Sequence, residues 1–171
     1  MEKSPPLFQV NLNRILIIDD DPIDRHLLKR QLLELFPEAV FLEADDEAAA
    51  IPHIPASPGF IFLDFHIPGV DEFSLLRVLR ATLPNVPIVL YTDTDHQEVS
   101  RRAVVAGADA YLPKILLNAE SIGRVMSRAT EAARARAQIR WYKSEIQALR
   151  ETLYDFALTP QTTLEATPNE E

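Results

Sequence analysis

The stretch FIFLDFHIPGVDEF, from Phe60 to Phe73, decides the fold class and the location of the site. Four apolar residues lead into one carboxylate, Asp64, and Pro68 follows four residues later. A short apolar run bounded by turn signals is typical of a buried strand. A carboxylate at the end of such a strand is costly unless it has a partner or a function. Because ligands bind at the carboxyl ends of strands in open α/β sheets, we predict a functional site at Asp64.

Strand and helix patterns alternate five times along the chain, at roughly 20- to 25-residue spacing, which predicts parallel strands with right-handed crossovers and helices on both faces. The predicted fold class is therefore α/β, a (βα)5 doubly wound five-stranded parallel sheet. The expected strands are 14–18, 40–44, 60–64, 88–92 and 108–112. The expected helices are 23–36, a brief one after 45–47, one from about 71 to 83, 99–106, and a long one from 119 to about 158.

The composition limits the possible functions. A chain of 171 residues with 47% hydrophobic residues fits one globular domain plus an appendage. The absence of cysteine excludes disulfides, thiolate zinc sites and cysteine nucleophiles. No run approaches the ~18 apolar residues of a membrane span, so we expect a soluble, cytoplasmic protein that does not bind membranes.

The net charge of −9 is unevenly distributed, because residues 124–150 carry seven basic and two acidic residues. An acidic body argues against nucleic-acid binding by the body and leaves it open for the basic segment. That segment invites comparison with a basic-zipper DNA reader, but its alanine-rich ARARA run has few polar base-reading residues. We therefore favour an ordinary solvated helix over DNA binding.

With parallel strands, all five carboxyl ends lie on one edge of the sheet. That edge collects Asp19, Asp20, Asp64, Thr92 and Lys114. Carboxylates that share a pocket repel one another unless a cation offsets their charge. An oxygen-only site of this kind suits Mg²⁺, which joins one or two carboxylates to a phosphate. A carboxylate can also accept a phosphoryl group as a nucleophile.

From Arg14 to about Ala129 the chain resembles a response-regulator receiver domain of two-component signalling, with a flavodoxin-like, CheY-like fold. Its motifs stand here as IIDDDP, LDFHIP, YTD and YLPK, in the family's order and each at a predicted strand end. The resemblance implies that a sensor histidine kinase or a phosphotransfer protein supplies a phosphoryl group. It also implies that the domain is not an enzyme and catalyses only its own phosphorylation and dephosphorylation.

The resemblance assigns roles to the site residues. Asp64 would be the phospho-acceptor and a Mg²⁺ ligand, with Asp20 as a direct ligand and Asp19 as a water-mediated one. The backbone carbonyl of His66 would also bind the metal. The imidazole side chains of the four histidines have unrelated spacings, so we predict no metal ligand or phosphodonor among them.

The resemblance also implies a switch. Thr92 and Lys114 would bind the phosphoryl oxygens, and Tyr111 would turn inward when Thr92 moves. Asp21, by contrast, is expected only to cap the following helix.

The sequence departs from the family pattern at three positions. Asp93 follows the switch threonine where a small residue is usual, and it could repel a phosphodonor or change the lifetime of the phosphate. Glu72 stands where glycine is common, and Ile115 replaces the proline that often follows the lysine, so we expect no cis peptide bond there. These departures leave open a phosphorylation-independent module, a pseudo-receiver that serves as a dimerisation scaffold.

The last predicted helix continues past the end of a receiver. From Ala119 to about Leu158 it contains no proline, and its apolar residues alternate three and four apart, as in a coiled coil. In a parallel dimer, Glu145 would face Arg150 of the second copy. We favour a parallel homodimer, while packing of the seam on its own receiver or on another domain stays open. The seam residues are Ile139, Tyr142, Ile146, Leu149, Leu153 and Phe156.

The predicted organisation has four parts. Residues 1–12 form a leader, 13–129 the receiver domain, 130–158 a helical extension and 159–171 a polar, disordered tail. A Mg²⁺-dependent phosphohydrolase of the haloacid dehalogenase type is a third hypothesis. Such enzymes use a second Asp two residues after the nucleophile, and His66 occupies that place. The sequence therefore favours a response regulator.

Overall fold

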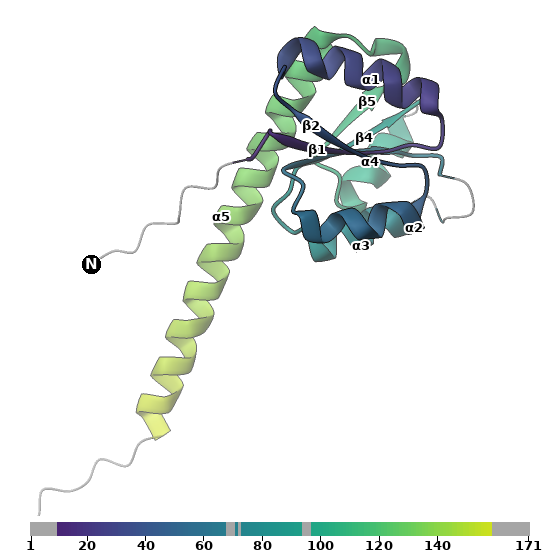
Figure 1. Ribbon diagram of the computed structural model, residues 1–171. Coiled ribbons are helices and arrows are strands. Elements are labelled where there is room, and N and C mark those ends of the chain that lie inside the picture. The colour runs from purple at the N-terminus through teal and green to yellow at the C-terminus, as the bar shows by residue number, and fades with distance from the viewer. Residues whose placement is uncertain (1–9, 68–70, 72, 94–96, 159–171) are drawn as a thin grey trace, which may run out of the picture. The chain divides into compact units, whose positions relative to one another are not determined.

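The computed structural model describes residues 10–67, 71, 73–93 and 97–158 (Figure 1). Five strands alternate with helices in this part of the chain, which confirms the predicted element order. The strands are β1 (Arg14–Ile18), β2 (Val40–Ala44), β3 (Phe60–Asp64), β4 (Ile88–Thr92) and β5 (Ala110–Pro113). The α-helices are α1 (Pro22–Leu35), α2 (Glu47–Ala50), α3 (Ser74–Thr82), α4 (Gln97–Ala106) and α5 (Ala119–Leu158). Two 3₁₀ helices are η1 (Ile51–Ala56) and η2 (Lys114–Leu116).

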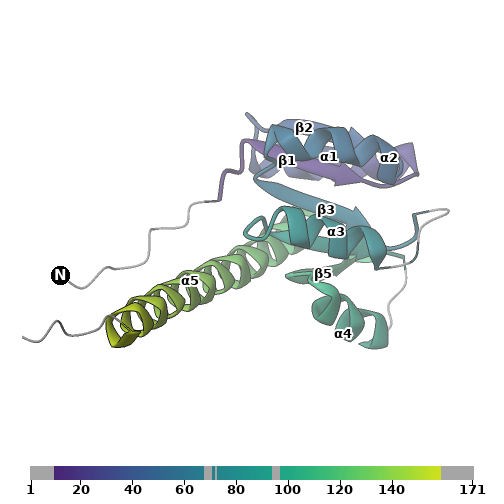
Figure 2. The same ribbon diagram turned by 90° about the horizontal axis from the view of Figure 1, so that it is seen from below.

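The five strands form one parallel sheet in the order β2-β1-β3-β4-β5 (Figure 2). In this order β1 lies beside β3, and β3 lies beside β4. The register pairs Ile18 with Leu63 and Asp64 with Tyr91. The ends of the three central strands are therefore level with one another, and the residues that follow them share one edge.

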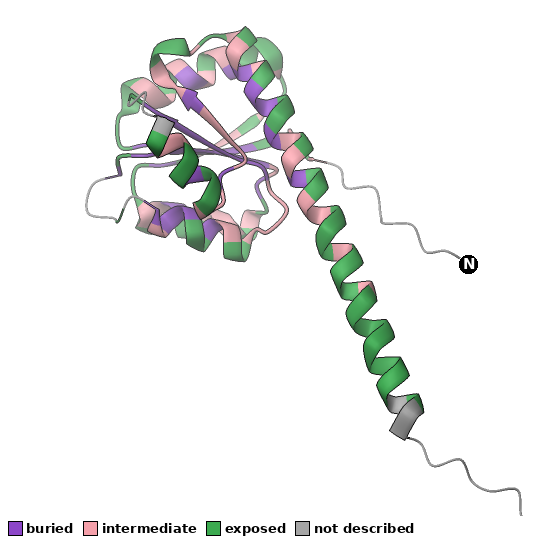
Figure 3. Ribbon diagram, turned by 180° about the vertical axis from the view of Figure 1, so that it is seen from behind, coloured by how far each residue is buried: buried purple, intermediate pink, exposed green. Residues whose placement is uncertain are grey.

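Each face of the sheet is covered by a helical layer and has its own apolar core (Figure 3). On one face, Phe60 and neighbouring strand residues pack against Leu28 of α1 and Ile122 of α5. On the other face, Leu63 and its neighbours pack against Leu76 of α3 and Ala103 of α4. Full burial of one such large side chain contributes about 1.5–3 kcal/mol. Because both faces are covered, the central strands β3 and β4 are buried along their whole length and are nearly continuous apolar runs, whereas the edge strand β2 contains the exposed Glu43.

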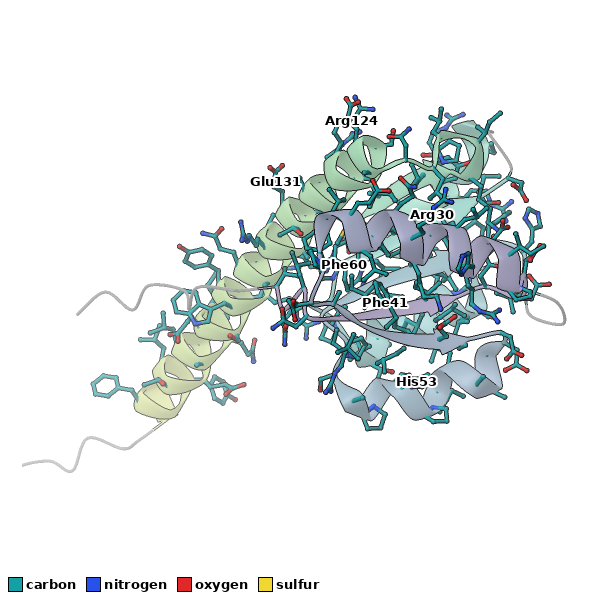
Figure 4. The ribbon with its side chains drawn as sticks, turned by 45° about the horizontal axis from the view of Figure 1, so that its top comes forward. Arg30, Phe41, His53, Phe60, Arg124 and Glu131 are labelled. Carbon is teal, nitrogen blue, oxygen red and sulfur yellow. The ribbon has the colours of Figure 1, made fainter. Side chains whose placement is uncertain are left out.

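Charged side chains project outward from α1 and α5, among them Arg30 and Arg124 (Figure 4). Arg124 and Glu131 lie on the exposed side of α5, whereas Phe60 lies under α1 within the core. Residues of α5 on the opposite side of that helix are buried against the sheet, among them Val125 and Ala129. The first half of α5 is thus an amphipathic helix that closes one face of the domain.

The start of α1 follows the predicted capping pattern. Asp21 accepts a hydrogen bond from the backbone N–H of Ile23 at 2.7 Å, and Pro22 occupies the first turn. The helix ends at Leu35, just before Phe36 and Pro37. The expectation that Asp21 serves as a cap is confirmed, and the strand-to-helix turn is fixed by this local bond.

Several element bounds differ from those expected from the pattern. The helix α3 begins at Ser74, three residues later than predicted, because Asp71 precedes it in a turn in which its carbonyl accepts the N–H and hydroxyl of Ser74. The strand β5 begins at Ala110 rather than at residue 108. The carboxylate of Asp109 holds the preceding turn by accepting the N–H of Ile88 at 2.9 Å.

A buried ionic cluster lies at the amino ends of β4 and β5. The side chain of Asp109 is 1% exposed and accepts a hydrogen bond from Arg80 Nη2 at 2.7 Å. Arg136 of α5 binds the same carboxylate through Nη1 and Nη2 and donates from Nε to the carbonyl of Pro84 at 2.9 Å. Gly107, whose φ of 118° suits glycine, turns its carbonyl toward Arg80 Nε at 2.9 Å. The cluster ties α3, α5 and two strands together.

The chain separates into two compact units, and the boundary falls within α5. One unit is Pro6–Ala137 and holds the sheet; the other includes residues from Gln138 onward. Most of the predicted leader (residues 1–9), the predicted tail (159–171), Pro68 and Glu72 fall outside the described residues. None of the helices in the described ranges has the length and apolar character that a membrane span requires.

Candidate functional site

Three of the predicted site side chains are buried at the carboxyl ends of neighbouring strands. Asp64 is the last residue of β3 and is 6% exposed, while Asp19, directly after β1, and Thr92, at the end of β4, are fully buried. Because Ile18 pairs with Leu63, the residues after them bring the two carboxylates to adjacent strand ends. The sheet register therefore creates the site.

Carboxylate oxygens of Asp19, Asp20 and Asp64 lie within 4.8 Å of one another. Mg²⁺ prefers oxygen ligands of this kind and retains several waters, so a cluster with one exposed and two buried carboxylates fits it. When bound, such a cation supplies positive charge that offsets the carboxylates and the oxygens of a phosphoryl group. The backbone N–H of His66 donates to Asp64 Oδ1 at 3.4 Å, which keeps residue 66 beside this carboxylate.

Lys114 begins η2 directly after β5 and reaches into the acidic cluster. Its Nζ lies 2.6 Å from Asp24 Oδ2, 2.9 Å from Asp19 Oδ2 and 3.1 Å from Asp64 Oδ2. The side chain of Lys114 is 8% exposed. An ammonium has three N–H donors, and three carboxylates surround this one. The predicted proximity of Lys114 and Asp64 is therefore present in the structure.

The charges of these groups influence one another. Burial raises the pKa of Asp64 above its ordinary value, and the ammonium of Lys114 opposes that effect only in part, while Asp19 adds to it. Burial also acts to lower the pKa of Lys114, but the carboxylates of Asp24, Asp19 and Asp64 outweigh it, so that pKa is raised. Lys114 stays protonated, and an additional cation would favour ionised Asp64.

Tyr91 contributes a phenol to the same pocket. Its side chain is fully buried, and its hydroxyl donates a hydrogen bond to Asp19 Oδ2. The Nζ of Lys114 lies 5.0 Å from the centre of its ring, within the range of a cation–π contact. Burial, followed by the neighbouring Asp19, raises the pKa of Tyr91, so the hydroxyl keeps its proton and remains a donor.

The predicted switch residues lie on neighbouring strands, Thr92 at the end of β4 and Tyr111 within β5. Thr92 Oγ1 is 3.3 Å from Nδ1 of His66, a contact between two residues that the sequence places 26 positions apart. Tyr111 is half-buried and packs with the apolar core on the α3 and α4 face. Asp93 is exposed directly after β4, and Ile115 is exposed directly after Lys114. None of the described peptide bonds is cis, as expected from Ile115.

Three side chains at the site are not predicted by the sequence pattern. Asp24, Tyr91 and the imidazole of His66 all lie beside predicted site residues. The position of Tyr91 could have been predicted, because it occupies the position before the last in its strand and pairs with Asp64 across β3 and β4. For Asp24 the pattern gave no signal, since its contact depends on how the first turn of α1 is rotated over the sheet.

Comparison with known proteins places this geometry in a family. Residues 15–125 match the response regulator receiver domain. The chain belongs to that family. Its fold is therefore that of a receiver domain of two-component signalling. The resemblance identified from the four motifs is confirmed.

Relatives of this receiver are found among bacterial regulators. The chain is 32% identical over 152 residues to the response regulator MprA of Mycobacterium avium, covering 87% of the chain and 61% of that protein. It is 32% identical over 119 residues to a gliding motility regulatory protein of Myxococcus xanthus, covering 68% of the chain and 15% of that protein. The chain thus spans only part of the length of these relatives.

Solved receiver structures superpose on the sheet domain. The signal receiver domain of the putative response regulator NarL from Mycobacterium tuberculosis has a TM-score of 0.58 and 29% identity, covering 68% of this chain and 94% of that one. The receiver domain of NtrX from Brucella abortus has a TM-score of 0.61 and 27% identity, with 68% and 98% covered.

Proposed function

We propose that this receiver accepts a phosphoryl group on Asp64 in a Mg²⁺-dependent reaction. The single observation that carries the proposal is the position of Lys114 Nζ, 3.1 Å from Asp64 Oδ2 inside a cluster of three carboxylates. A buried carboxylate between a cation site and an ammonium has the surroundings that a phosphoryl acceptor needs. By the same proposal, Asp20 binds Mg²⁺ directly, Asp19 binds it through water, and the backbone carbonyl of His66 completes the protein ligands.

The transfer proceeds from the carboxylate of Asp64. One of its oxygens attacks the phosphorus atom of the donor, a new O–P bond forms, and the donor group leaves with the electron pair of the broken bond. The ammonium of Lys114 and the hydroxyl of Thr92 then hold oxygens of the transferred group. Because Thr92 is within 3.3 Å of His66, its movement toward the phosphoryl group changes that contact. Tyr111 would follow by turning inward beside it.

The donor would be a sensor histidine kinase or a phosphotransfer protein, in keeping with the family to which the chain belongs. In this proposal the receiver is not an enzyme toward other molecules, and it promotes only the gain and loss of its own phosphoryl group. The phosphorylation signal would be passed on by the conformational change at Thr92 and through the helical extension.

Intact mass spectrometry tests the acceptor directly. The full chain is incubated with Mg²⁺ and acetyl phosphate, and the added mass of one phosphoryl group is expected. Asp64→Asn should abolish it, and chelation of Mg²⁺ should prevent it. Asp45→Asn, which changes an exposed acid after β2, serves as the matched control and should label like the wild type. Labelling that persists in Asp64→Asn would disprove the assignment of the acceptor.

A chain that gains no phosphoryl mass at all would support the alternative function. In that case the protein would be a phosphorylation-independent dimerisation or scaffold module, and the receiver fold would serve binding alone. Phosphomonoester turnover by the wild type would instead support the phosphohydrolase hypothesis.

The second part of the proposal is that α5 dimerises the protein. Large apolar side chains recur three and four residues apart on this helix and are exposed in a single chain, with Ile146 at 50% and Leu149 at 61%. This spacing suits a parallel coiled coil with a second copy, because each apolar side chain then packs between four from the other helix. Glu145 and Arg150 would add opposite charges beside that seam.

Light scattering at micromolar concentration tests the dimer. The wild type should have twice the monomer mass of 19.3 kDa. Leu149→Asp puts a charge in the seam and should give a monomer, whereas Ser144→Asp puts the same charge on the opposite side of the helix and should leave the dimer intact. A wild-type monomer would rule out this part of the proposal and leave the acceptor role unaffected.

A further inference from the structure

We infer that Tyr91 is a positioning residue for the cation site, through its hydrogen bond to Asp19; the inference rests on the proposed Mg²⁺-dependent function. Tyr91 Oη donates to Asp19 Oδ2, and both side chains are completely buried. The other oxygen, Asp19 Oδ1, accepts the backbone N–H of Asp21 at 2.8 Å. Each oxygen of Asp19 therefore accepts a hydrogen bond from a different donor, which fixes the plane of the carboxylate.

The strand order places the Tyr91 hydroxyl within reach of Asp19. Tyr91 pairs with Asp64 across β3 and β4, while Asp19 lies at the end of β1 on the far side of β3. The phenol therefore reaches across the end of β3 and joins the two strands that flank the acceptor. Its ring packs edge-on against Phe62 at 6.2 Å between ring centres, so the direction of the hydroxyl is set by the core.

The hydrogen bond matters because Asp19 contacts Lys114 and is also a proposed ligand of the cation through water. Its Oδ2 also lies 2.9 Å from Lys114 Nζ, so without the phenol the ammonium would hold this oxygen with no opposing donor. A carboxylate drawn by Lys114 alone would present a different edge to the cation. Groups that hydrogen-bond a metal-binding carboxylate orient it, and their loss commonly weakens metal binding by about 10- to 100-fold.

The experiment measures Mg²⁺ affinity in the unphosphorylated full chain by NMR titration. Tyr91→Phe keeps the ring and removes the hydroxyl, and it should raise the dissociation constant by about tenfold. Tyr154→Phe, which removes an exposed hydroxyl from α5, should leave it unchanged. The effect should also vanish in an Asp19→Asn background, because the hydroxyl acts through that carboxylate, but it should persist in an Asp45→Asn background.

A second measurement uses the unmodified chain. Mg²⁺ should perturb the near-ultraviolet absorption of the wild type, and the perturbation should be missing from Tyr91→Phe. Unchanged or tighter Mg²⁺ binding by Tyr91→Phe, or a wild-type spectrum that Mg²⁺ does not change, would overturn the inference while leaving the proposed function in place. A wild type that binds no Mg²⁺ would overturn both, and urea unfolding of each variant separates a loss of stability from a loss of binding.

Discussion

Removal of the Asp109 carboxylate should destabilise the fold far more than removal of an ion pair of equal length on the surface. Asp109→Ala would leave the guanidinium groups of Arg80 and Arg136 facing each other with no anion between them. Their side chains are 14% and 27% exposed, so neither can be fully hydrated. The N–H of Ile88 would also lose its acceptor. Breaking a buried ion pair typically costs about 3–5 kcal/mol, and we expect a value in that range.

The structure supplies a matched control. Asp71 and Arg77 form an ion pair of 2.7 Å, the same distance as between Asp109 and Arg80, but their side chains are 67% and 58% exposed. Asp71→Ala should therefore cost less than about 1 kcal/mol, because water and salt already screen that pair. Because the two ion pairs have the same length, the difference between the two losses of unfolding free energy reports the effect of burial.

Removal of one arginine should have an intermediate effect. Arg136→Ala leaves Asp109 bound to Arg80 and to the N–H of Ile88, so no buried charge is left unpaired. The loss is then the hydrogen bonds of a part-exposed guanidinium, about 1–2 kcal/mol. The free-energy loss of Asp109→Asn should lie between those of Arg136→Ala and Asp109→Ala, because asparagine keeps an acceptor and removes the charge.

Urea unfolding followed by circular dichroism measures all four variants at two salt concentrations. A loss of 3–5 kcal/mol is a large share of the stability of a domain, about 5–15 kcal/mol, so Asp109→Asn keeps the test possible if Asp109→Ala does not fold. Equal losses for Asp109→Ala and Asp71→Ala would refute the reasoning. A strong salt dependence for the Asp109 variants would also contradict it.

Two further predictions concern the site. Burial raises the pKa of Asp64 above its ordinary value of 3.8, so ionised Asp64 opposes folding at neutral pH in metal-free buffer. Asp64→Asn should therefore unfold at higher urea near pH 7, and its advantage over the wild type should disappear below pH 3.8, where both the folded and the unfolded wild type are protonated. A difference that does not change with pH would argue against this cause. Asp24→Asn should release Lys114 toward Asp64 and speed phosphoryl labelling by roughly threefold, in line with the ~0.2–1 kcal/mol of a part-exposed ion pair; slower labelling, measured as the rate of mass gain, would show that Asp24 positions Lys114 instead.

The fold was predictable because strands that are buried on both faces of a sheet are recognisable as short apolar runs in the sequence. The central strands of a covered parallel sheet are short apolar runs, and here those runs end in polar turn signals such as Asp19 or Asp64. The bounds were less predictable where a side chain from elsewhere decides them. The strand β5 starts late because Asp109 binds the N–H of Ile88 in another strand, and no local pattern encodes that contact.

The candidate site residues that lie at strand ends could be predicted from the sequence. Asp19, Asp64, Thr92 and Lys114 all come from strand ends or from the residue after one, so topology alone brings them together. Asp24 differs, because it belongs to α1. Its carboxylate reaches Lys114 only for one rotation of that helix, which is set by the packing of apolar side chains on the sheet and not by any residue near Asp24.

Tyr91 lies between these cases, and its role follows from the two-residue period of a strand. Phe60, Phe62 and Asp64 point to one face of β3, and the register that pairs Asp64 with Tyr91 puts the phenol on that same face. Thr92, one residue later, points to the other face, toward which Tyr111 also packs. The sheet thus divides the pocket. The phenol and the acids share the face covered by α1 and α5, the predicted switch pair shares the face covered by α3 and α4, and Asp64 at the edge is the group through which the two sides meet.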